Sequence, residues 1–177
     1  MEDAFQRSAQ EDEGKPREQH LTFEENERGV SFDDLFGPYL EGASEIVVTD
    51  PYIRLFFQAR NMMELLETVA RVKDPGEEVS VHLVTSRDEF EDDRQEEYLQ
   101  EMQASAATVG VRFTWEYDDS GTIHARHIVT DTGWKILLDR GLDIFQRYEM
   151  NDAFAFANRM QDQRAVKAFE VTYLRVA

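Results

Sequence analysis

The chain has 177 residues, and 41% of them are hydrophobic, so it is long enough and apolar enough to form one domain with a buried core. Its 37 acidic and 19 basic side chains give a net charge of −18, which excludes nucleic-acid binding driven by overall charge alone. The absence of cysteine excludes disulfide scaffolds, thiolate zinc sites and cysteine nucleophiles. No apolar run approaches the roughly 20 residues needed to cross a bilayer, and no signal peptide is recognisable at the N-terminus. We therefore predict a cytoplasmic protein.

Residues 1–30 differ in composition from the rest of the chain. They contain nine acids, four bases and no sustained apolar period, which is typical of a disordered acidic arm. The folded domain is predicted over residues 31–177. This domain is acidic in its own right, so the arm alone does not explain the charge of the chain.

The first half of the predicted domain alternates helices and strands. Apolar residues at helical spacing predict a helix from Ser31 to Leu40, with Ser31 as its N-cap. A β-branched run over 45–49 predicts a buried strand, which Asp50-Pro51 ends. An apolar stripe over 55–69 predicts a second helix, and residues 79–85 predict a second buried strand.

The second half is predicted to contain one more helix and a series of strands. The helix covers about 88–109 and ends at Gly110. Strict alternation over 111–117 predicts a strand with one covered face, and turns then separate strands at 122–130, 134–139 and 165–176. The predicted fold class is α/β, a mixed sheet flanked by helices with an antiparallel meander in its second half.

Histidine is scarce, which narrows the search for a reactive imidazole. Residues two apart on the predicted strand 122–130 share a face, so His124 and Arg126 are expected to point the same way and His127 the other. An imidazole beside a guanidinium is suited to bind phosphate. The alternative is a surface pair on the strand, or an ion pair with an acid such as Asp131. His127 is expected to be a core or interface histidine.

The spacing of these residues resembles a known motif. His124, Arg126 and Asp131 match the His-x-Lys-x4-Asp motif of the phospholipase D superfamily, with arginine in place of lysine. The resemblance implies that the histidine attacks phosphorus, the cation neutralises the phosphate and the aspartate supports the motif. Such an active site needs two motifs, so a phosphodiesterase of this chain would assemble across a homodimer. Arginine preserves phosphate binding, but it replaces a compact point charge with a planar fork.

Five short blocks extend the resemblance over about residues 31–175. The blocks occupy residues 50–54, 82–86, 123–126, 133–136 and 140–145. In this order they resemble the phospholipase D-like domain that follows a microtubule-interacting-and-trafficking (MIT) domain in eukaryotes. The resemblance implies a phospholipase D-like fold, a homodimer, and binding of phosphoinositide-rich membrane without lipase activity. Eukaryotic members of the family work in abscission with ESCRT-III proteins.

Two departures from the family change what is expected here. Residues 1–30 are too few and too polar to form the helical module that binds ESCRT-III, so ESCRT-III binding is not expected. The net charge of −18 opposes docking on anionic lipid, which usually relies on clusters of lysine and arginine. A free-standing domain with four lysines and fifteen arginines favours a prokaryotic copy.

Further candidate ligand-binding residues follow the predicted strands or lie within the resembling blocks. The carboxyl ends of strands in α/β sheets commonly bind ligands, although capping or ion pairing alone would explain several of these residues. His82 lies within a predicted strand, where a satisfied buried histidine is the alternative. No metal or cofactor is predicted. The candidates are Asp50, Tyr52, Arg54, His82, Ser86, Lys135 and Arg140.

Three functional hypotheses follow. The first is a non-catalytic or degenerate phospholipase D-like binding module that recognises a phosphate-bearing ligand, such as a phosphoinositide or another phosphodiester, or a protein partner. On a lipid ligand this module would act as a peripheral membrane protein. The second is a phosphodiesterase across a homodimer, with His124 as nucleophile. The third is an acidic interaction subunit of a larger prokaryotic stress or defence complex.

Overall fold

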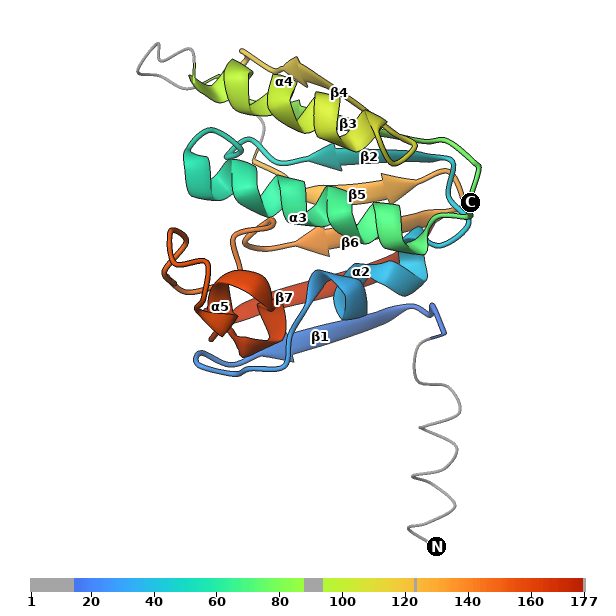
Figure 1. Ribbon diagram of the computed structural model, residues 1–177. Helices are drawn as coiled ribbons and strands as arrows, with labels where there is room; N and C mark the ends of the chain where they lie inside the picture. The colour runs from blue at the N-terminus through green and yellow to red at the C-terminus, as the bar shows by residue number, and fades with distance from the viewer. Residues whose placement is uncertain (1–14, 88–93, 123, 177) are drawn as a thin grey trace, which may run out of the picture.

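A mixed sheet of seven strands runs through the residues that the computed structural model describes, which are 15–87, 94–122 and 124–176 (Figure 1). The strands lie in the order β1-β7-β6-β5-β2-β3-β4. β2, β3 and β4 are parallel, whereas β2-β5, β5-β6, β6-β7 and β7-β1 pair antiparallel. This arrangement confirms the predicted fold class, with an antiparallel meander formed by β5, β6 and β7; β4 is not part of it, because it pairs parallel with β3. The bounds are β1 Gln19–Phe23, β2 Glu45–Thr49, β3 Val79–Thr85, β4 Val111–Tyr117, β5 His127–Thr130, β6 Trp134–Leu138 and β7 Phe169–Arg175.

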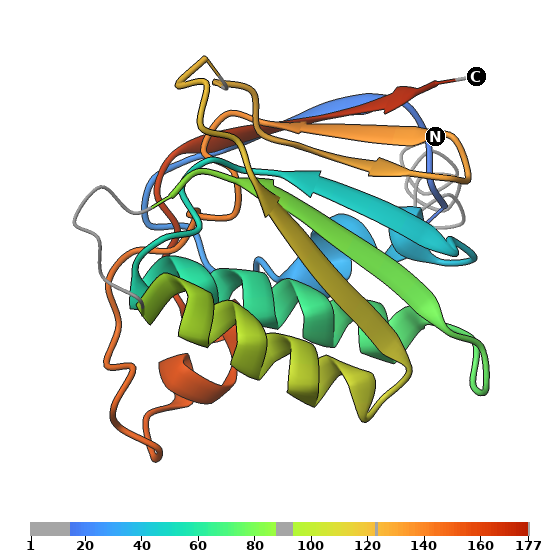
Figure 2. The ribbon, with the colours of Figure 1, turned by 90° about the horizontal axis from the view of Figure 1, so that it is seen from above.

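Three helices, α2, α3 and α4, cover the same face of this sheet (Figure 2). α2 begins where predicted, because the Oγ of Ser31 accepts a hydrogen bond from the backbone N–H of Asp34 at 3.1 Å. α3 and α4 follow β2 and β3 as crossover helices, as the strand and helix order predicts. The bounds are α2 Phe32–Leu40, α3 Phe56–Val72, α4 Arg94–Ala107 and α5 Phe156–Arg159, with a 3₁₀ turn at Gln161–Gln163. The first part of the helix predicted over 88–109 lies outside the described residues.

The hydrophobic core lies between the sheet and these helices. Alternate side chains of each strand point into it, since successive residues of a strand face opposite sides. Met62 and Leu65 of α3 and Leu99 of α4 are fully buried against Val81 and Ile128 of the sheet. Burial of a large aliphatic side chain stabilises a fold by about 1.5–3 kcal/mol. These buried side chains therefore hold the helices against one face of the sheet.

The opposite face of the sheet is uncovered within the described part of the chain. The sequence predicts β2 and β3 as fully buried strands, but only alternate side chains of each are buried. Val47 and Val84, which lie on the uncovered face, contributed to the apolar runs on which that prediction rests. Parallel strands are usually covered on both faces, whereas the described residues cover only one face of these strands.

β1 lies inside the segment predicted as a disordered arm. It pairs antiparallel with β7, and the ring of Phe23 stacks on Phe169 with centroids 4.5 Å apart. The prediction of disorder is therefore wrong for Gln19–Phe23. The alternation of Leu21 and Phe23 is too short to stand out among the surrounding charges. Residues 1–14 lie outside the described residues.

β5 is shorter than predicted, because it begins at His127 instead of near residue 122. The Asp118 carboxylate accepts a hydrogen bond from the backbone N–H of Ser120 at 2.8 Å, and Gly121 has a φ of +68°. Both features favour an irregular loop over a strand. The expectation that His124 and Arg126 share one face of a strand is therefore wrong.

A buried ion pair fastens the segment between β6 and β7 to α3. Arg164 donates two hydrogen bonds to the Glu64 carboxylate, at 2.7 and 2.9 Å. The guanidinium also lies over the ring of Tyr148, 4.0 Å from its centroid, and donates to the carbonyl of Ala157. Arg164 thereby connects α3, the ring of Tyr148 and the backbone of α5 at Ala157.

Replacing Arg164 with alanine should lower the free energy of unfolding by about 3–5 kcal/mol, because Glu64 would remain as an unpaired buried charge. Arg71→Ala is the matched control. Arg71 pairs with Asp33 at 2.9 Å, but both side chains are half-exposed, so its loss should cost about 1 kcal/mol or less. Urea unfolding followed by circular dichroism measures both values, and equal losses would contradict the assignment.

Candidate functional site

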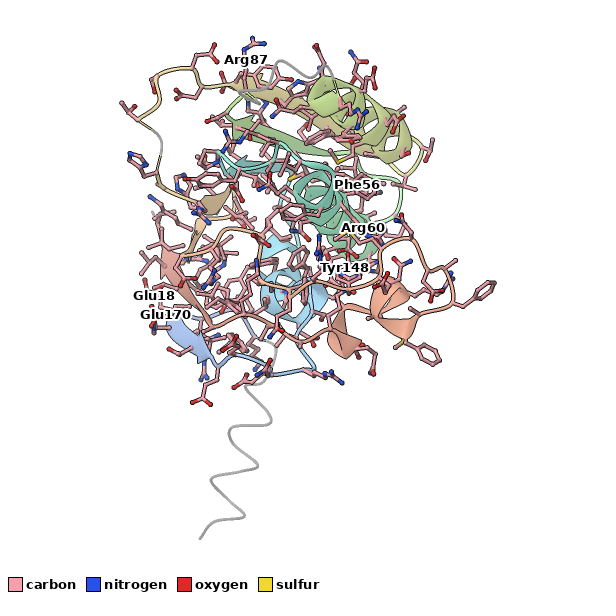
Figure 3. The ribbon with its side chains drawn as sticks, turned by 90° about the vertical axis from the view of Figure 1, so that its left-hand side faces the viewer. Glu18, Phe56, Arg60, Arg87, Tyr148 and Glu170 are labelled. Atoms are coloured by element: carbon pink, nitrogen blue, oxygen red, sulfur yellow. The ribbon has the colours of Figure 1, made fainter. Side chains whose placement is uncertain are left out.

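Residues far apart in sequence meet at one end of the sheet. β2 and β6 run in the same direction and β5 runs against them, so the ends of β2 and β6 lie beside the start of β5. Asp50 follows β2, Arg140 follows β6 and Arg126 precedes β5. Figure 3 looks onto this end, where α3 begins and where Phe56, Arg60 and Tyr148 lie near one another. The topology therefore gathers several of the predicted site residues.

Asp50 is the connecting group of this end. It is only 3% exposed, and its two carboxylate oxygens accept hydrogen bonds from the backbone N–H of Tyr52 at 3.0 Å and of Leu142 at 3.3 Å. Burial raises the pKa of this carboxyl, while the two backbone N–H groups and then Arg126 act to lower it. Asp50 thus ties the end of β2 to the loop after β6.

Gly141 allows this approach of two segments. Its φ is +61°, a conformation that favours glycine. A Cβ there would overlap the Asp50 carboxylate and lie 2.8 Å from the Cδ of Arg126. Arg140 and Gly141 thus form a turn in which the backbone passes close to Asp50.

A cavity of about 250 Å³ opens beside Asp50. Within the described residues, the guanidinium of Arg126 makes no hydrogen bond or ion pair, and it lies over the ring of Tyr52 at 4.4 Å. Arg54 lies 5.2 Å from the same ring. Arg140 donates from Nε to the carbonyl of Ala168 at 2.6 Å. The lining residues are Asp50, Tyr52, Ile53, Gln58, Asn61, Arg126, Arg140 and Asp143.

A second hollow of about 700 Å³ adjoins this cavity through Asn61 and Asp143. Phe56 and Phe57 line one side of it, and residues 145–151 line the other. Sequence analysis missed the second hollow and four residues of the first, namely Ile53, Gln58, Asn61 and Asp143. Their spacing carries no motif, because the site assembles from α3 and the loop after β6.

The other predicted residues lie elsewhere. His124 is exposed on the loop before β5 and lines neither hollow. Asp131 lies beyond the other end of β5, roughly 16 Å from residue 126 at about 3.3 Å per strand residue, and accepts a hydrogen bond from the backbone N–H of Ser44. The backbone carbonyl of Ser86 accepts a hydrogen bond from Gln95 at 2.7 Å.

Two more predicted residues lie on the uncovered sheet face. His82 forms hydrogen bonds with Thr114 at 2.8 Å and with Glu116 at 3.1 Å. Lys135 lies on β6, and together with burial, which is the larger cause, it lowers the pKa of His127. The structure therefore brings Asp50, Tyr52, Arg126 and Arg140 together, with Arg54 beside them, and separates the rest.

Two negative findings apply to the described residues. Among them, no group of three histidine, aspartate or glutamate side chains is placed to hold a metal ion. No helix there has both the length and the apolar composition to span a membrane.

Comparison with known proteins places the chain in a family. Residues 29–175 match the model of the phospholipase D-like domain at the C-terminus of MIT proteins. The chain belongs to this family. It is also 36% identical over 138 residues to MIT domain-containing protein 1 of Mus musculus, an alignment that covers 77% of this chain and 53% of the mouse protein. The match thus spans about half the length of that relative, and it confirms the resemblance found in the sequence.

Within this phospholipase D-like domain, Gly141→Ala should disturb the Asp50 junction and lower the free energy of unfolding by about 3 kcal/mol. The left-handed backbone alone costs about 1–2 kcal/mol, and overlap with the carboxylate adds to it. Gly76→Ala is the matched control, since its φ is +83° but no atom lies within 4 Å of the added Cβ. Thermal and urea unfolding compare the two, and a loss at position 141 no larger than at position 76 would contradict this role.

Proposed function

We propose that this phospholipase D-like domain is a non-catalytic binding module that recognises a phosphate-bearing head group at the cavity beside Asp50. The supporting observation is that Arg126 lines the cavity and that its guanidinium has no ion-pair partner among the described residues. Arginine binds phosphate as a planar fork of N–H donors. Arg140 lines the same cavity, so a phosphate there would be bound by two guanidinium groups.

The two carboxylates of the cavity are already engaged. Asp50 accepts hydrogen bonds from two backbone N–H groups, and its raised pKa reflects how poorly its negative charge is solvated. Asp143 accepts a hydrogen bond from Lys167 at 2.9 Å. Arg126 is near enough to Asp50 to lower its pKa, but among the described residues it forms no hydrogen bond or ion pair within 4.0 Å with either carboxylate, so its N–H donors can bind an anion.

Exposed aromatic side chains at the same end support docking on a membrane surface. Phe154 is 95% exposed and Phe156 is 72% exposed, at the start of α5. Figure 1 shows α5 at the end of the sheet where α3 begins. Large exposed aromatic groups beside arginines can enter the interface of a bilayer while the cations meet lipid phosphates. Peripheral association with a membrane is thus part of this proposal.

The catalytic alternative finds less support. His124 is exposed on a loop, and the motif that it forms with Arg126 and Asp131 is divided between the two ends of β5. A nucleophile must lie within reach of the bound phosphorus. A phosphodiesterase assembled across a homodimer therefore stays a prediction.

Arg126→Gln should weaken binding to phosphatidylcholine vesicles that contain a phosphoinositide by about tenfold, because a charge-assisted contact to phosphate is lost. Arg112→Gln is the matched control, since Arg112 is an exposed arginine on β4. Vesicle flotation at low salt measures binding, and competition by a free inositol phosphate separates head-group recognition from membrane insertion. Equal effects of the two variants, or no flotation at all, would overturn the proposal.

We also propose that two copies of the chain associate through the uncovered sheet face. Val47 and Leu174 are exposed there, and the Nδ1 of His127 is buried without a hydrogen-bond partner within the described residues. A parallel sheet normally has a second covering layer, which a partner copy would supply.

Val47→Glu should convert such a dimer to a monomer, since a carboxylate would be buried against the partner. Val109→Glu is its control, because Val109 is exposed after α4, away from the sheet face. Sedimentation equilibrium gives the mass of each variant. A wild-type monomer, or a dimer unaffected by Val47→Glu, would exclude this interface.

A further inference from the structure

A groove runs along the outer side of the helical layer, between α3 and α4. The two helices lie side by side in both ribbon views (Figures 1 and 2). They run in the same direction because each connects two neighbouring parallel strands. The groove between them has a volume of about 370 Å³. Its lining residues are Phe56, Ala59, Arg60, Met63, Glu64, Glu67, Tyr98, Glu101, Met102 and Ser105.

The floor of the groove is apolar and adaptable. Phe56 is 50% exposed, and its ring meets that of Tyr98 edge-on with centroids 5.8 Å apart. Met63 and Met102 lie deeper, one from each helix. Methionine side chains fit apolar groups of varied shape because they are unbranched and polarizable. This floor can accept one or two large apolar side chains.

The rim of the groove is acidic. Among the described residues, Glu101 forms no ion pair, and Glu67 has one partner, Arg71, at 3.7 Å. Burial and then the neighbouring Glu64 raise the pKa of Glu67, so its negative charge is poorly compensated. Arg60, which is the cation of the lining, is turned toward the Asn158 carbonyl at 3.0 Å. A cation arriving from outside would meet Glu101, which has no ion-pair partner among the described residues, and Glu67, which is paired only with the half-exposed Arg71.

We propose that this groove binds a basic amphipathic helix of a partner protein. Its apolar side chains contact Phe56, Met63 and Met102, and its lysine or arginine side chains pair with Glu67 and Glu101. A helix that lays an apolar face into a groove between helices is a recurrent form of recognition. The proposal goes beyond phosphate binding, because the groove contains neither Arg126 nor Arg140.

The charges of the groove disfavour other occupants. An anionic lipid surface would be repelled by Glu67 and Glu101. Residues 1–14 of this chain carry five acids and one base, so they match the groove poorly. A basic partner helix is the occupant that complements both the floor and the rim.

The test uses two synthetic helical peptides of equal length, one built from leucine and lysine and the other from leucine and glutamate, each with one apolar face. The leucine–lysine peptide should bind, and the leucine–glutamate peptide should not. Glu67→Lys combined with Glu101→Lys should weaken binding about tenfold. Glu24→Lys combined with Glu25→Lys is the matched control, since it makes the same change in net charge at exposed positions of the loop after β1. Fluorescence anisotropy measures the affinities.

Ser105→Arg is a second variant, which fills the groove from an exposed helix position and should also weaken binding about tenfold. Arg126→Gln should leave peptide binding unchanged, so a failure of the phosphate proposal is distinguishable from a failure here. Equal loss in the two double variants would show that overall charge attracts the peptide, and would overturn the groove assignment. Binding of the leucine–glutamate peptide, or full binding by Ser105→Arg, would overturn it as well.

Discussion

The burial of one face of the sheet under the helices is the constraint on which the rest of this structure depends. Val81 and Ile128 are fully buried on that face, while His82 and Val129, their neighbours in sequence, lie on the other. A shift of pairing by one residue would exchange the two sets, so the hydrophobic effect sets the register of every strand. The same constraint leaves two surfaces outside the core, the uncovered sheet face and the outer groove between α3 and α4.

A buried carboxylate joins two segments at the end of the sheet that carries the candidate site. Asp50 joins the end of β2 to the loop after β6 through backbone hydrogen bonds, and Gly141 provides the space that this requires. A buried charge is expensive unless its hydrogen bonds are satisfied, and here both oxygens accept one. Arg126 and Arg140 line the cavity beside this junction.

The acidic character of the chain is compatible with a local site for phosphate. Charges separated by more than a Debye length, about 8 Å at physiological salt, are largely screened. An anion at the cavity therefore responds mainly to the arginines around it, including Arg126 and Arg140, and much less to distant carboxylates. The α3–α4 groove has the opposite sign, with Glu67 and Glu101 at its rim. The two surfaces favour partners of opposite charge at separate places on one domain.

Local patterns of apolar and polar residues in the sequence predicted most of the helices and strands. Alternation predicted β4, helical spacing predicted α2 and α3, and short blocks in a fixed order predicted the family. These features depend on neighbours within a few residues, or on residues shared with relatives.

Only the tertiary structure decided which of the predicted residues meet. Arg164 and Glu64 are 100 residues apart, and nothing in their surroundings in the sequence marks them as a pair. The motif of His124, Arg126 and Asp131 is regular in sequence, yet a four-residue strand separates Arg126 from Asp131. β1 was hidden in a charged segment, because its stability comes from pairing with β7 at the far end of the chain. The spacing of residues along a chain reflects the period of a helix or strand. A site depends instead on which strands are neighbours in the sheet, because residues at the ends of neighbouring strands lie close together.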